Sequence, residues 1–337
     1  MSRQEENIQI IIYGLGPIGM EILKKCEESL PGKVIGAVDI DPEKSGKDIS
    51  ALIGGKARGV KVVSSIKDIK IEEKANCITI HATGSNLVAV WPQFKEILDH
   101  NCSIVSTCEQ LAYPWYRYPE LATEIHEYAK SKNLIIIGTG INPGYVMDTL
   151  VLSISSVVNN ITSIKVDRHV DVKKRRLPLQ QKVGVGMNEE EFKKLAKENK
   201  IGHVGLEESL RLVAAGLNLE LTSVETTLVP TIADKPLSLN NSIIEVGQVN
   251  GQHQVARGKT SDGTTIELNL IMSTSVESED RIVIDGDMKQ ELVVPNGIFG
   301  DSATASIIIN TAKTLAFESQ SGLLTMKDIR ITRNIHL

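Results

Sequence analysis

The sequence predicts an α/β protein: a Rossmann-type, doubly wound parallel sheet, followed by an α+β domain with a mainly antiparallel sheet. Three observations support this fold class. The apolar run Ile8–Ile12 leads directly into a glycine motif, Gly14–Gly19. Apolar runs then alternate with amphipathic helical segments through the first half of the chain, as in parallel sheets. In the second half, strand-like segments follow one another with few helices between them.

The glycine motif has the G-x-G-x-x-G pattern that joins a strand to a helix in dinucleotide-binding domains. Gly14 permits the tight turn, Gly16 lets the backbone approach a pyrophosphate, and Gly19 allows close packing of helix on strand. Pro17 suits the first helical turn, where its missing N–H is not needed. Together with Ile18, these residues form the predicted cofactor loop, whose free N–H groups face an anion.

A carboxylate, Asp39, follows the second predicted strand, Val34–Val38. Its spacing from the glycines suits an acceptor for a ribose hydroxyl. Because a carboxylate repels a 2′-phosphate, the sequence predicts NAD as the cofactor. The next residue is Ile40 rather than an arginine, but Lys44 and Lys47 could partly compensate, so NADP is possible.

The remaining first-half elements are predicted from apolar runs and helical periodicity. Their carboxyl ends should share one sheet edge, where ligands of such sheets bind. The residues at this edge include Ala82, Thr83 and Gly84, which we assign to the cofactor, and Glu109. The predicted strands are Val60–Val63, Cys77–Ala82, Ile104–Val105 and Leu134–Ile137, and the helices are Leu87–Leu98 and Glu120–Lys130.

The second half is predicted as a twisted meander of antiparallel strands with helices on one face. Asn250-Gly251 and Asp262-Gly263 are typical hairpin turns. The other face of such a sheet needs cover, which makes a homodimer through it plausible. The predicted helices are Met147–Val157, Asn188–Lys197 and Gly205–Leu217, and the strands are Ile161–Val172, Leu219–Val229, Ile243–Val249, Gln252–Arg257, Thr265–Ser273 and Arg281–Ile284.

We therefore expect two domains. Residues 1–145 form the dinucleotide-binding domain, and residues 146–299 form the α+β domain for substrate and dimerisation. A helix predicted over Ala303–Ala316 suggests that residues 300–337 return to the first domain.

Composition narrows the class of protein further. The net charge of −5, with scattered basic residues, argues against nucleic-acid binding. The polar segment Met1–Asn7 has no signal-peptide core, and no apolar stretch is long enough to span a bilayer. The four cysteines form no C-x-x-C pair and suit reduced, packed thiols. These features predict a cytoplasmic protein.

Glu109 is the leading candidate for the catalytic residue. It follows a buried strand at the predicted ligand edge, in Ser106-Thr107-Cys108-Glu109-Gln110. A partly desolvated carboxylate beside a nicotinamide could exchange protons near neutrality, as the interconversion of amine and carbonyl requires. A carboxylate at a helix start or on the surface is the alternative interpretation.

The segment Gly138-Thr139-Gly140-Ile141-Asn142-Pro143-Gly144 follows the next strand of the first half. Its glycines and prolines predict a rigid, irregular turn. Asn142 could anchor the nicotinamide carboxamide or the substrate; Pro143 is assigned to the cofactor and Ile141 to the substrate. A hinge between domains is an alternative and compatible interpretation.

Basic residues of the second half are candidates for holding a substrate. His203 stands between glycines in Gly202-His203-Val204-Gly205, where close approach to a ligand is possible, although a packed histidine is the more ordinary interpretation. Arg175 belongs to the basic run Lys173–Arg176, which either lies in solvent or holds a substrate carboxylate. His169 and Lys182 are weaker candidates. No spacing of histidine, cysteine or acidic residues suggests a metal site.

Taken together, these motifs resemble the 2,4-diaminopentanoate dehydrogenases and the related native NAD(P)H-dependent amine dehydrogenases, which share a dihydrodipicolinate reductase type of amino-terminal domain. The resemblance runs nearly from end to end. It is carried by Gly14–Gly19, Val38-Asp39-Ile40-Asp41-Pro42, Glu109, Thr139–Gly144, Gly202-His203-Val204-Gly205-Leu206-Glu207-Glu208-Ser209 and Gly300-Asp301-Ser302-Ala303-Thr304-Ala305.

This resemblance implies a homodimer and a reversible oxidative deamination, with Glu109 as the catalytic acid and base. C4 of 2,4-diaminopentanoate would become a ketone, giving 2-amino-4-oxopentanoate and ammonia, and reductive amination of ketones would be the reverse.

True dihydrodipicolinate reductases carry a His-His-x-x-Lys-x-Asp-x-Pro-Ser-Gly-Thr signature. The comparable stretch here, Arg168–Lys173, lacks the Pro-Ser-Gly-Thr part.

Two other functions remain open from the sequence. One is an imine or carbonyl reductase on the same scaffold, which would not depend on ammonia. The other is a non-catalytic dinucleotide sensor, which would bind NAD(H) without turning over an amine.

Overall fold

The computed structural model describes residues 8–73, 75–239 and 242–335. The polar segment Met1–Asn7 lies outside the described residues. The chain divides into two compact units, each with its own core. Unit 1 comprises Met1–Tyr145 and Phe299–Leu337, and unit 2 comprises Val146–Ile298.

Unit 1 contains a seven-stranded sheet in which every adjacent pair of strands is parallel. The strand order is β15-β6-β5-β4-β1-β2-β3, the order of a doubly wound sheet with one strand added at an edge. The strands are β1 (Ile8–Tyr13), β2 (Val34–Val38), β3 (Val62–Val63), β4 (Asn76–His81), β5 (Ser103–Ser106), β6 (Ile135–Gly138) and β15 (Gly322–Leu324).

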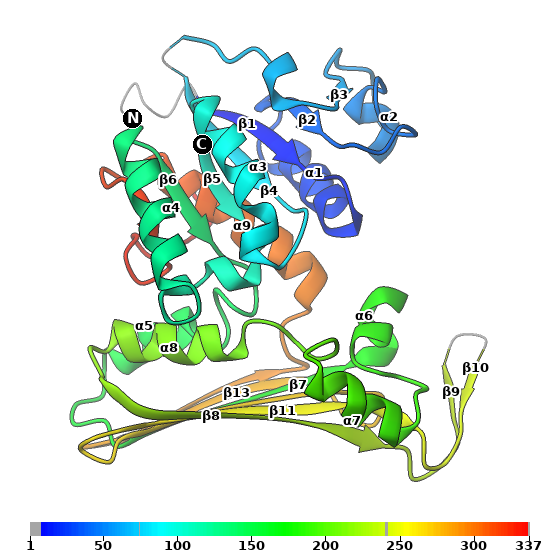
Figure 1. The fold of residues 1–337 in the computed structure, drawn as a ribbon, viewed down its shortest axis with the longest axis vertical. Helices are drawn as coiled ribbons and strands as arrows, with labels where there is room; N and C mark the ends of the chain where they lie inside the picture. The colour runs from blue at the N-terminus through cyan, green and yellow to red at the C-terminus, as the bar shows by residue number, and fades with distance from the viewer. Residues whose placement is uncertain (1–7, 74, 240–241, 336–337) are drawn as a thin grey trace. The chain divides into compact units, whose positions relative to one another are not determined.

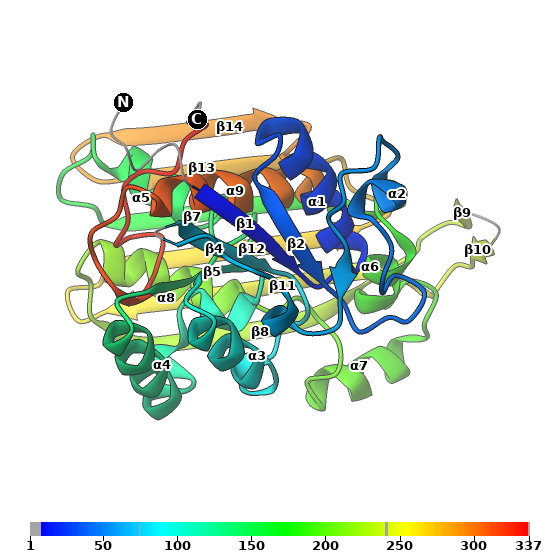
Figure 2. The same ribbon diagram turned by 90° about the horizontal axis from the view of Figure 1, so that it is seen from above.

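Helices cover both faces of this sheet, as Figure 2 shows. On one face, α1 (Pro17–Ser29) packs against α9 (Gly300–Leu315). On the other face lie α3 (Leu87–Asp99) and α4 (Pro119–Ser131). Their apolar side chains, among them Phe94, Ile97 and Ile125, are buried in the core. The short helices are α2 (Ile49–Ile53), η1 (Ile66–Asp68), η2 (Glu109–Leu111) and η3 (Pro114–Tyr116).

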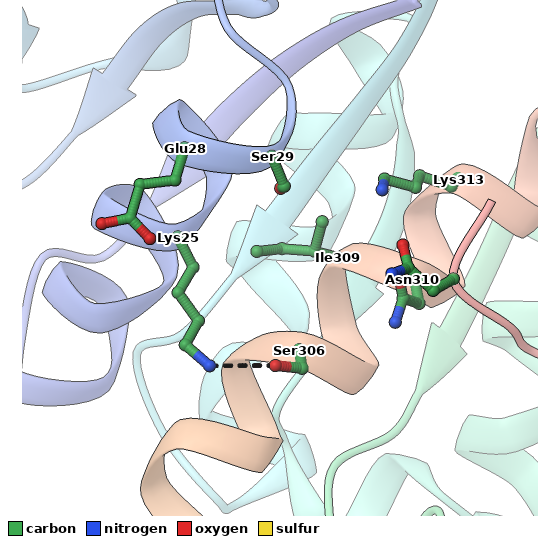
Figure 3. A pocket seen from close by; sticks show the side chains of 8 residues that line it. Lys25, Glu28, Ser29, Ser306, Ile309, Asn310 and Lys313 are labelled. Carbon is green, nitrogen blue, oxygen red and sulfur yellow. Dashed lines mark hydrogen bonds between the residues drawn. The ribbon is translucent and has the colours of Figure 1, made fainter. Parts of the chain in front are cut away.

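The returning helix α9 is tied to α1 by polar contacts. The Lys25 ammonium donates to the backbone carbonyl of Ser302 at 2.9 Å. It also donates to the hydroxyl of Ser306 at 3.0 Å, as Figure 3 shows. These contacts border a pocket of about 270 Å³ that Lys313 also lines. The helix predicted over residues 303–316 therefore belongs to unit 1.

Unit 2 is built on a six-stranded sheet with the order β14-β13-β7-β12-β11-β8. In Figure 1 its helices lie on one face of this sheet, and no drawn helix covers the other face. The strands are β7 (Ser163–Asp171), β8 (Leu221–Ile232), β11 (Val249–Thr260), β12 (Thr265–Ser273), β13 (Glu279–Asp285) and β14 (Lys289–Pro295), with a separate hairpin of β9 (Leu237–Leu239) and β10 (Ser242–Ile244). The helices are α5 (Thr149–Ser155), η4 (Val172–Lys174), α6 (Leu177–Lys182), α7 (Glu189–Lys197) and α8 (Leu206–Gly216).

The predicted fold class is confirmed for both units, but the meander topology is wrong. β7, the first strand of unit 2, lies in the middle of the sheet, parallel to β12 and antiparallel to β13. Its side chains largely alternate between buried and more exposed positions, a pattern typical of a central strand and an edge strand alike. Periodicity shows that a strand exists, whereas its neighbours are fixed by long-range contacts.

The Asn250-Gly251 turn is also wrong, because both residues lie inside β11. The register of β11 against β8 shifts between Val249 and Gly251, so the pair forms a bulge. A side chain at Gly251 would strike the backbone of Met272 on β12, which explains the glycine without a turn. The predicted strand Ile243–Val249 is in fact interrupted by a turn after Ile244.

Candidate active site

Four strand ends of unit 1 meet at one edge of the sheet. Backbone hydrogen bonds continue the ladder past the strands: Ala82 N–H donates to the Tyr13 carbonyl, Thr107 to His81, and Thr139 to Ser106, at 2.8 to 3.0 Å. The loops that carry the predicted cofactor residues and Glu109 are therefore neighbours. This edge is where a doubly wound sheet binds its ligand.

The glycine loop fits the turn that a dinucleotide requires. Gly14 has φ +94°, and a side chain there would come within 2.8 Å of the Ala82 carbonyl oxygen. A side chain at Gly19 would overlap the Gly14 carbonyl, so the helix can approach the strand only with glycine. At Gly16, by contrast, the position of a side chain is open space. The loop thus leaves room for a ligand at the N-terminus of α1, where Pro17 and Ile18 open the helix.

Asp39 joins the glycine loop to the end of β2. Its carboxylate accepts from Leu15 N–H at 2.6 Å and from Asp41 N–H at 2.8 Å. The Lys44 ammonium lies 3.6 Å from Asp39 and 3.0 Å from Asp41. Since a carboxylate has about four acceptor positions, Asp39 can still accept from a ribose hydroxyl. The side chain of the following residue, Ile40, is 89% exposed.

Beneath this edge lies a polar network that the sequence did not reveal, centred on His81. The ring is fully buried at the end of β4, and its Nδ1 lies 2.9 Å from the Ser106 hydroxyl on β5. Its Nε2 lies 2.8 Å from the side-chain oxygen of Gln93 on α3. Thr83 donates its hydroxyl to the same Gln93 oxygen at 2.6 Å. Burial lowers the pKa of His81 to about 4, so the ring is neutral at physiological pH.

The hydrogen bonds of this network have one consistent direction. The Gln93 oxygen only accepts, and Nε2 of His81 also lies 2.9 Å from the Thr83 hydroxyl oxygen. The tautomer with the proton on Nε2 fits both contacts, and its Nδ1 accepts from the Ser106 hydroxyl. Ser106 oxygen in turn accepts from Cys108 N–H at 3.0 Å. Cys108 is the residue before Glu109, which begins η2. His81 therefore orients, through Ser106, the turn that presents Glu109. An isolated polar residue at the end of an apolar strand is the signal that could have revealed it.

The loop after β6 is compact. Asn142 and Pro143 are buried and joined by a cis peptide bond, and Ile141 is half-buried. Gly144 has φ +126°, and a side chain there would strike the Thr139 hydroxyl. That buried hydroxyl has no hydrogen-bond partner among the described residues. It is therefore a group that a bound amide could satisfy.

Within unit 2, Arg175 is less exposed than the other residues of the basic run Lys173–Arg176. Lys173, Lys174 and Arg176 are exposed, whereas Arg175 is half-buried. Burial is the main cause that lowers the pKa of Arg168, and the charge of Arg175 lowers it further, so the two guanidinium groups are near one another.

Buried polar side chains of unit 2 donate hydrogen bonds to backbone carbonyls at two places, the turn that contains Arg175 and the carboxyl end of the unit at Ile298. The side chain of Gln180 on α6 donates to the backbone carbonyls of Val172 and Arg175 at 3.0 and 2.9 Å. Arg168 is paired with Asp280 at 2.6 Å and donates to the Ile298 carbonyl at 2.9 Å. This pair could not be predicted from the sequence, because its two residues are distant in the chain.

His203 lies in the turn before α8, and its N–H donates to the Gln254 side chain on β11 at 3.1 Å. Gly202 and Gly205 both have positive φ, 112° and 111°, which explains the glycines on either side. Lys182 is half-buried at the end of α6, and its carbonyl accepts from Gly202 N–H.

A second glutamine of β11, Gln252, was missed in the sequence. It is fully buried, and neither its amide oxygen nor its amide nitrogen has a hydrogen-bond partner among the described residues. Gln252 shares the face of β11 that carries Gly258, where a side chain would meet Leu210 of α8. A buried amide without partners costs about 1–3 kcal/mol. Such an amide on the helix-covered face is suited to receive a polar ligand group.

His169 lies apart from these groups. Alternation along β7 places it on the face opposite Arg168, beside Ile271 of β12 and Glu279 of β13. That is the face without helices, so the structure does not bring His169 together with Arg175.

Neither metal-binding clusters nor membrane-spanning helices are found in the described parts of the chain. No group of three histidine, cysteine or acidic side chains there could hold a metal ion. No helix there is long and apolar enough to cross a bilayer. The described cysteines, Cys26, Cys77, Cys102 and Cys108, are all buried, and none of them forms a disulfide bond.

Comparisons with known proteins agree with this architecture. A family described as "2,4-diaminopentanoate dehydrogenase C-terminal domain" matches residues 145–336. The 2,4-diaminopentanoate dehydrogenase of Acetoanaerobium sticklandii is 26% identical over 353 aligned residues, covering 98% of this chain and 95% of the relative.

Solved structures share the fold. An amine dehydrogenase from Mycobacterium smegmatis superposes with a TM-score of 0.84 at 20% identity, covering 97% of each chain. An oxidoreductase from Agrobacterium radiobacter, solved with NAD⁺, L-tartaric acid and magnesium, gives a TM-score of 0.58 at 10% identity, covering 96% of this chain and 93% of that one.

The fold, the glycine loop and these likenesses define a dehydrogenase that uses NAD or NADP. The family match extends over more than half of the chain. The chain belongs to the 2,4-diaminopentanoate dehydrogenase family, and the resemblance drawn from the sequence is confirmed.

Proposed function

We propose that this NAD(P)-dependent amine dehydrogenase oxidises C4 of 2,4-diaminopentanoate to a ketone, releasing 2-amino-4-oxopentanoate and ammonia. An oxidoreductase that acts on a CH–NH₂ donor follows from the family. The specific substrate is supported by the relative from A. sticklandii, which matches this chain over nearly its whole length. The reverse reaction is the reductive amination of a ketone with ammonia.

The residues of unit 1 fit a bound dinucleotide. The N-terminus of α1 at Gly16 would face the pyrophosphate, and Asp39 would accept from a ribose hydroxyl. Ala82, Thr83 and Gly84, with Asn142 and Pro143, would border the nicotinamide half. When bound, the nicotinamide supplies the hydride acceptor. Asp39 favours NAD over NADP, because the nearby Lys44 is already shared between two carboxylates.

Glu109 is the proposed acid and base. In the oxidative direction it accepts a proton from the substrate ammonium, leaving the amine free to lose hydride from its carbon. After releasing this proton to solvent, Glu109 accepts a proton from the water that adds to the C=N bond and passes it to the nitrogen. It then takes the hydroxyl proton as the C–N bond breaks, so that the ketone forms and ammonia leaves. The single observation that carries this role is the position of Glu109, half-buried in the turn that Ser106 holds at the ligand edge.

Polar groups on the helix-covered side of the unit 2 sheet are proposed to bind polar groups of the substrate. The Arg175 guanidinium suits a carboxylate, and His203 and Gln252 suit the second amino group. Ile141 of unit 1 would contribute an apolar contact. His169 remains a weaker candidate because it lies on the other face of the sheet.

We also propose a homodimer that works in the cytoplasm. The helix-free face of the unit 2 sheet exposes Val229, half of whose side chain is accessible, and a second copy would cover such a face. The four described cysteines form no disulfide bond, which suits a reducing compartment.

The first experiment is to give the purified protein 2,4-diaminopentanoate with NAD⁺ and NADP⁺ separately, and to measure reduced nicotinamide and ammonia. We expect faster reduction of NAD⁺, with one ammonia released per reduced cofactor. Reduction without ammonia would contradict the deamination and favour a carbonyl or imine reductase.

The role of Glu109 is tested by Glu109→Gln. Turnover should fall by about 10²–10⁴-fold, the usual contribution of a general acid or base. Affinity for the cofactor, measured by fluorescence titration, should stay within a few fold. Glu120→Gln, the same change on the exposed first turn of α4, is the matched control. If Glu109→Gln and the control turn over equally, Glu109 takes no part in the reaction.

A further inference from the structure

Two of the four cysteines are neighbours in the core of unit 1. The sulfur of Cys102 lies 2.8 Å from the sulfur of Cys77. Both side chains are almost fully buried, at 0% and 3% exposure, in the cluster that includes Ile97 and Leu98 of α3. The proposed reaction uses neither thiol.

Strand register brings the two residues together. Ile78 of β4 pairs with Ser103 of β5 in parallel register, and each cysteine precedes its strand partner by one position. Adjacent strands are about 4.8 Å apart, within the range of about 4.4–6.8 Å between α-carbons that a disulfide spans. The sulfur atoms need to approach by only about 1 Å to bond. No large movement of the backbone is therefore required.

We propose that Cys77 and Cys102 are a redox modification site, at which a small oxidant such as a peroxide converts the pair into an intramolecular disulfide. The Cys102 thiolate attacks one oxygen of hydrogen peroxide, forming a sulfenic acid and releasing hydroxide. The Cys77 thiol then displaces the sulfenic hydroxyl, which leaves as water with the Cys77 proton, and the hydroxide from the first step takes up the proton that Cys102 lost on ionisation. Overall, two thiols are oxidised and one peroxide is reduced to two waters.

The position of the pair predicts the effect of this bond. Both cysteines lie at the amino-terminal ends of β4 and β5, whereas the ligand edge lies at the carboxyl ends of the same strands. The disulfide closes a loop that contains α3, which restricts the unfolded chain. Oxidation should therefore raise the unfolding temperature and leave cofactor binding unchanged, and dithiothreitol should reverse it.

The test is to treat the full-length protein with hydrogen peroxide, alkylate the remaining thiols in denaturant, and map the peptides by mass spectrometry. Alkylatable thiols should fall from four to two, with a linked peptide that joins Cys77 to Cys102. Because the pair is buried, a parallel sample is oxidised in a urea concentration just below the unfolding transition. Cys26→Ser, the matched control at another buried cysteine, should still lose two thiols.

In Cys77→Ser and Cys102→Ser the linked peptide should be absent and no intramolecular disulfide should form. A linkage through Cys26 or Cys108, a disulfide between two chains, or retention of all four thiols in both samples would overturn the proposal. Deamination activity does not enter this test, so its outcome is independent of the proposed function.

Discussion

At the scale of single residues, the buried His81 has the most specific role that the structure suggests. It accepts from Ser106 on one side and donates to Gln93 on the other, so three elements are held at the ligand edge. His81→Phe keeps a ring but removes both bonds. We expect turnover to fall at least tenfold, because Ser106 no longer fixes the turn before Glu109, with cofactor affinity changing less.

The matched control is His100→Phe. His100 bonds the Ile69 carbonyl at 2.9 Å, near the opposite end of β5. Its loss should lower stability by about 1 kcal/mol without a change in turnover. Equal turnover in the two variants, measured as kcat with saturating substrate, would show that Glu109 does not depend on His81.

The pKa of His81 also predicts a dependence of stability on pH. Burial lowers this pKa from 6.5 to about 4, so between these values the unfolded chain binds a proton that the folded chain does not. The free energy of unfolding should therefore fall as pH drops from 6.5 to 4, by up to about 3 kcal/mol from this group. Urea unfolding at pH 7 and pH 5 checks it: His81→Phe should lose less stability than the wild type over this interval.

At the same scale, we expect Asp39 to determine the choice between NAD and NADP. Asp39→Asn keeps an acceptor for the ribose but removes the charge that repels a 2′-phosphate, and it frees Lys44 to meet that phosphate. We expect the ratio of kcat/KM for NADP⁺ to that for NAD⁺ to rise by about tenfold, roughly 1.4 kcal/mol. The control is Asp41→Asn, because the Asp41 carboxylate also pairs with Lys44 but, unlike that of Asp39, is not bonded to Leu15 of the glycine loop. This change should alter the ratio much less. An unchanged ratio in Asp39→Asn would contradict the assignment of the ribose acceptor.

At the scale of elements, the sequence predicts what depends on local order and misses what depends on pairing. Gly14, Gly19 and Asp39 could be placed because the turn, the helix and the carboxylate follow one another within one strand-helix-strand unit. Gln252 could not, because nothing in the sequence shows which face of β11 carries α8 or which polar groups find partners there. The central position of β7 was missed for the same reason.

The strand β11 offers a direct test of the substrate groups. Gln252→Leu removes an amide without partners and replaces it with an apolar group of similar size, so stability should be unchanged or higher. If the amide binds substrate, KM should rise by about tenfold while cofactor affinity stays constant. Gln290→Leu on β14, whose side-chain amide donates to the sulfur of Met288, is the matched control. A normal KM for Gln252→Leu would remove this residue from the substrate site.

At the scale of the whole molecule, the helix-free face of the unit 2 sheet determines the expected assembly. Ile271 lies near the middle of that face, between His169 of β7 and His253 of β11. An apolar side chain at the centre of an uncovered sheet is costly in water unless a second copy covers it. We expect light scattering to give twice the chain mass of 36.8 kDa.

Ile271→Glu should shift the protein to the single-chain mass, because the dimer would bury an unpaired charge on each side of the interface. Val88→Glu, at an exposed position of α3 in unit 1, should leave the mass unchanged. The far-ultraviolet spectrum of Ile271→Glu should match that of the wild type, since this side chain lies outside the core that α8 covers. A wild-type protein that elutes as a single chain at micromolar concentration, or an Ile271→Glu variant that stays dimeric, would place the interface elsewhere or exclude it.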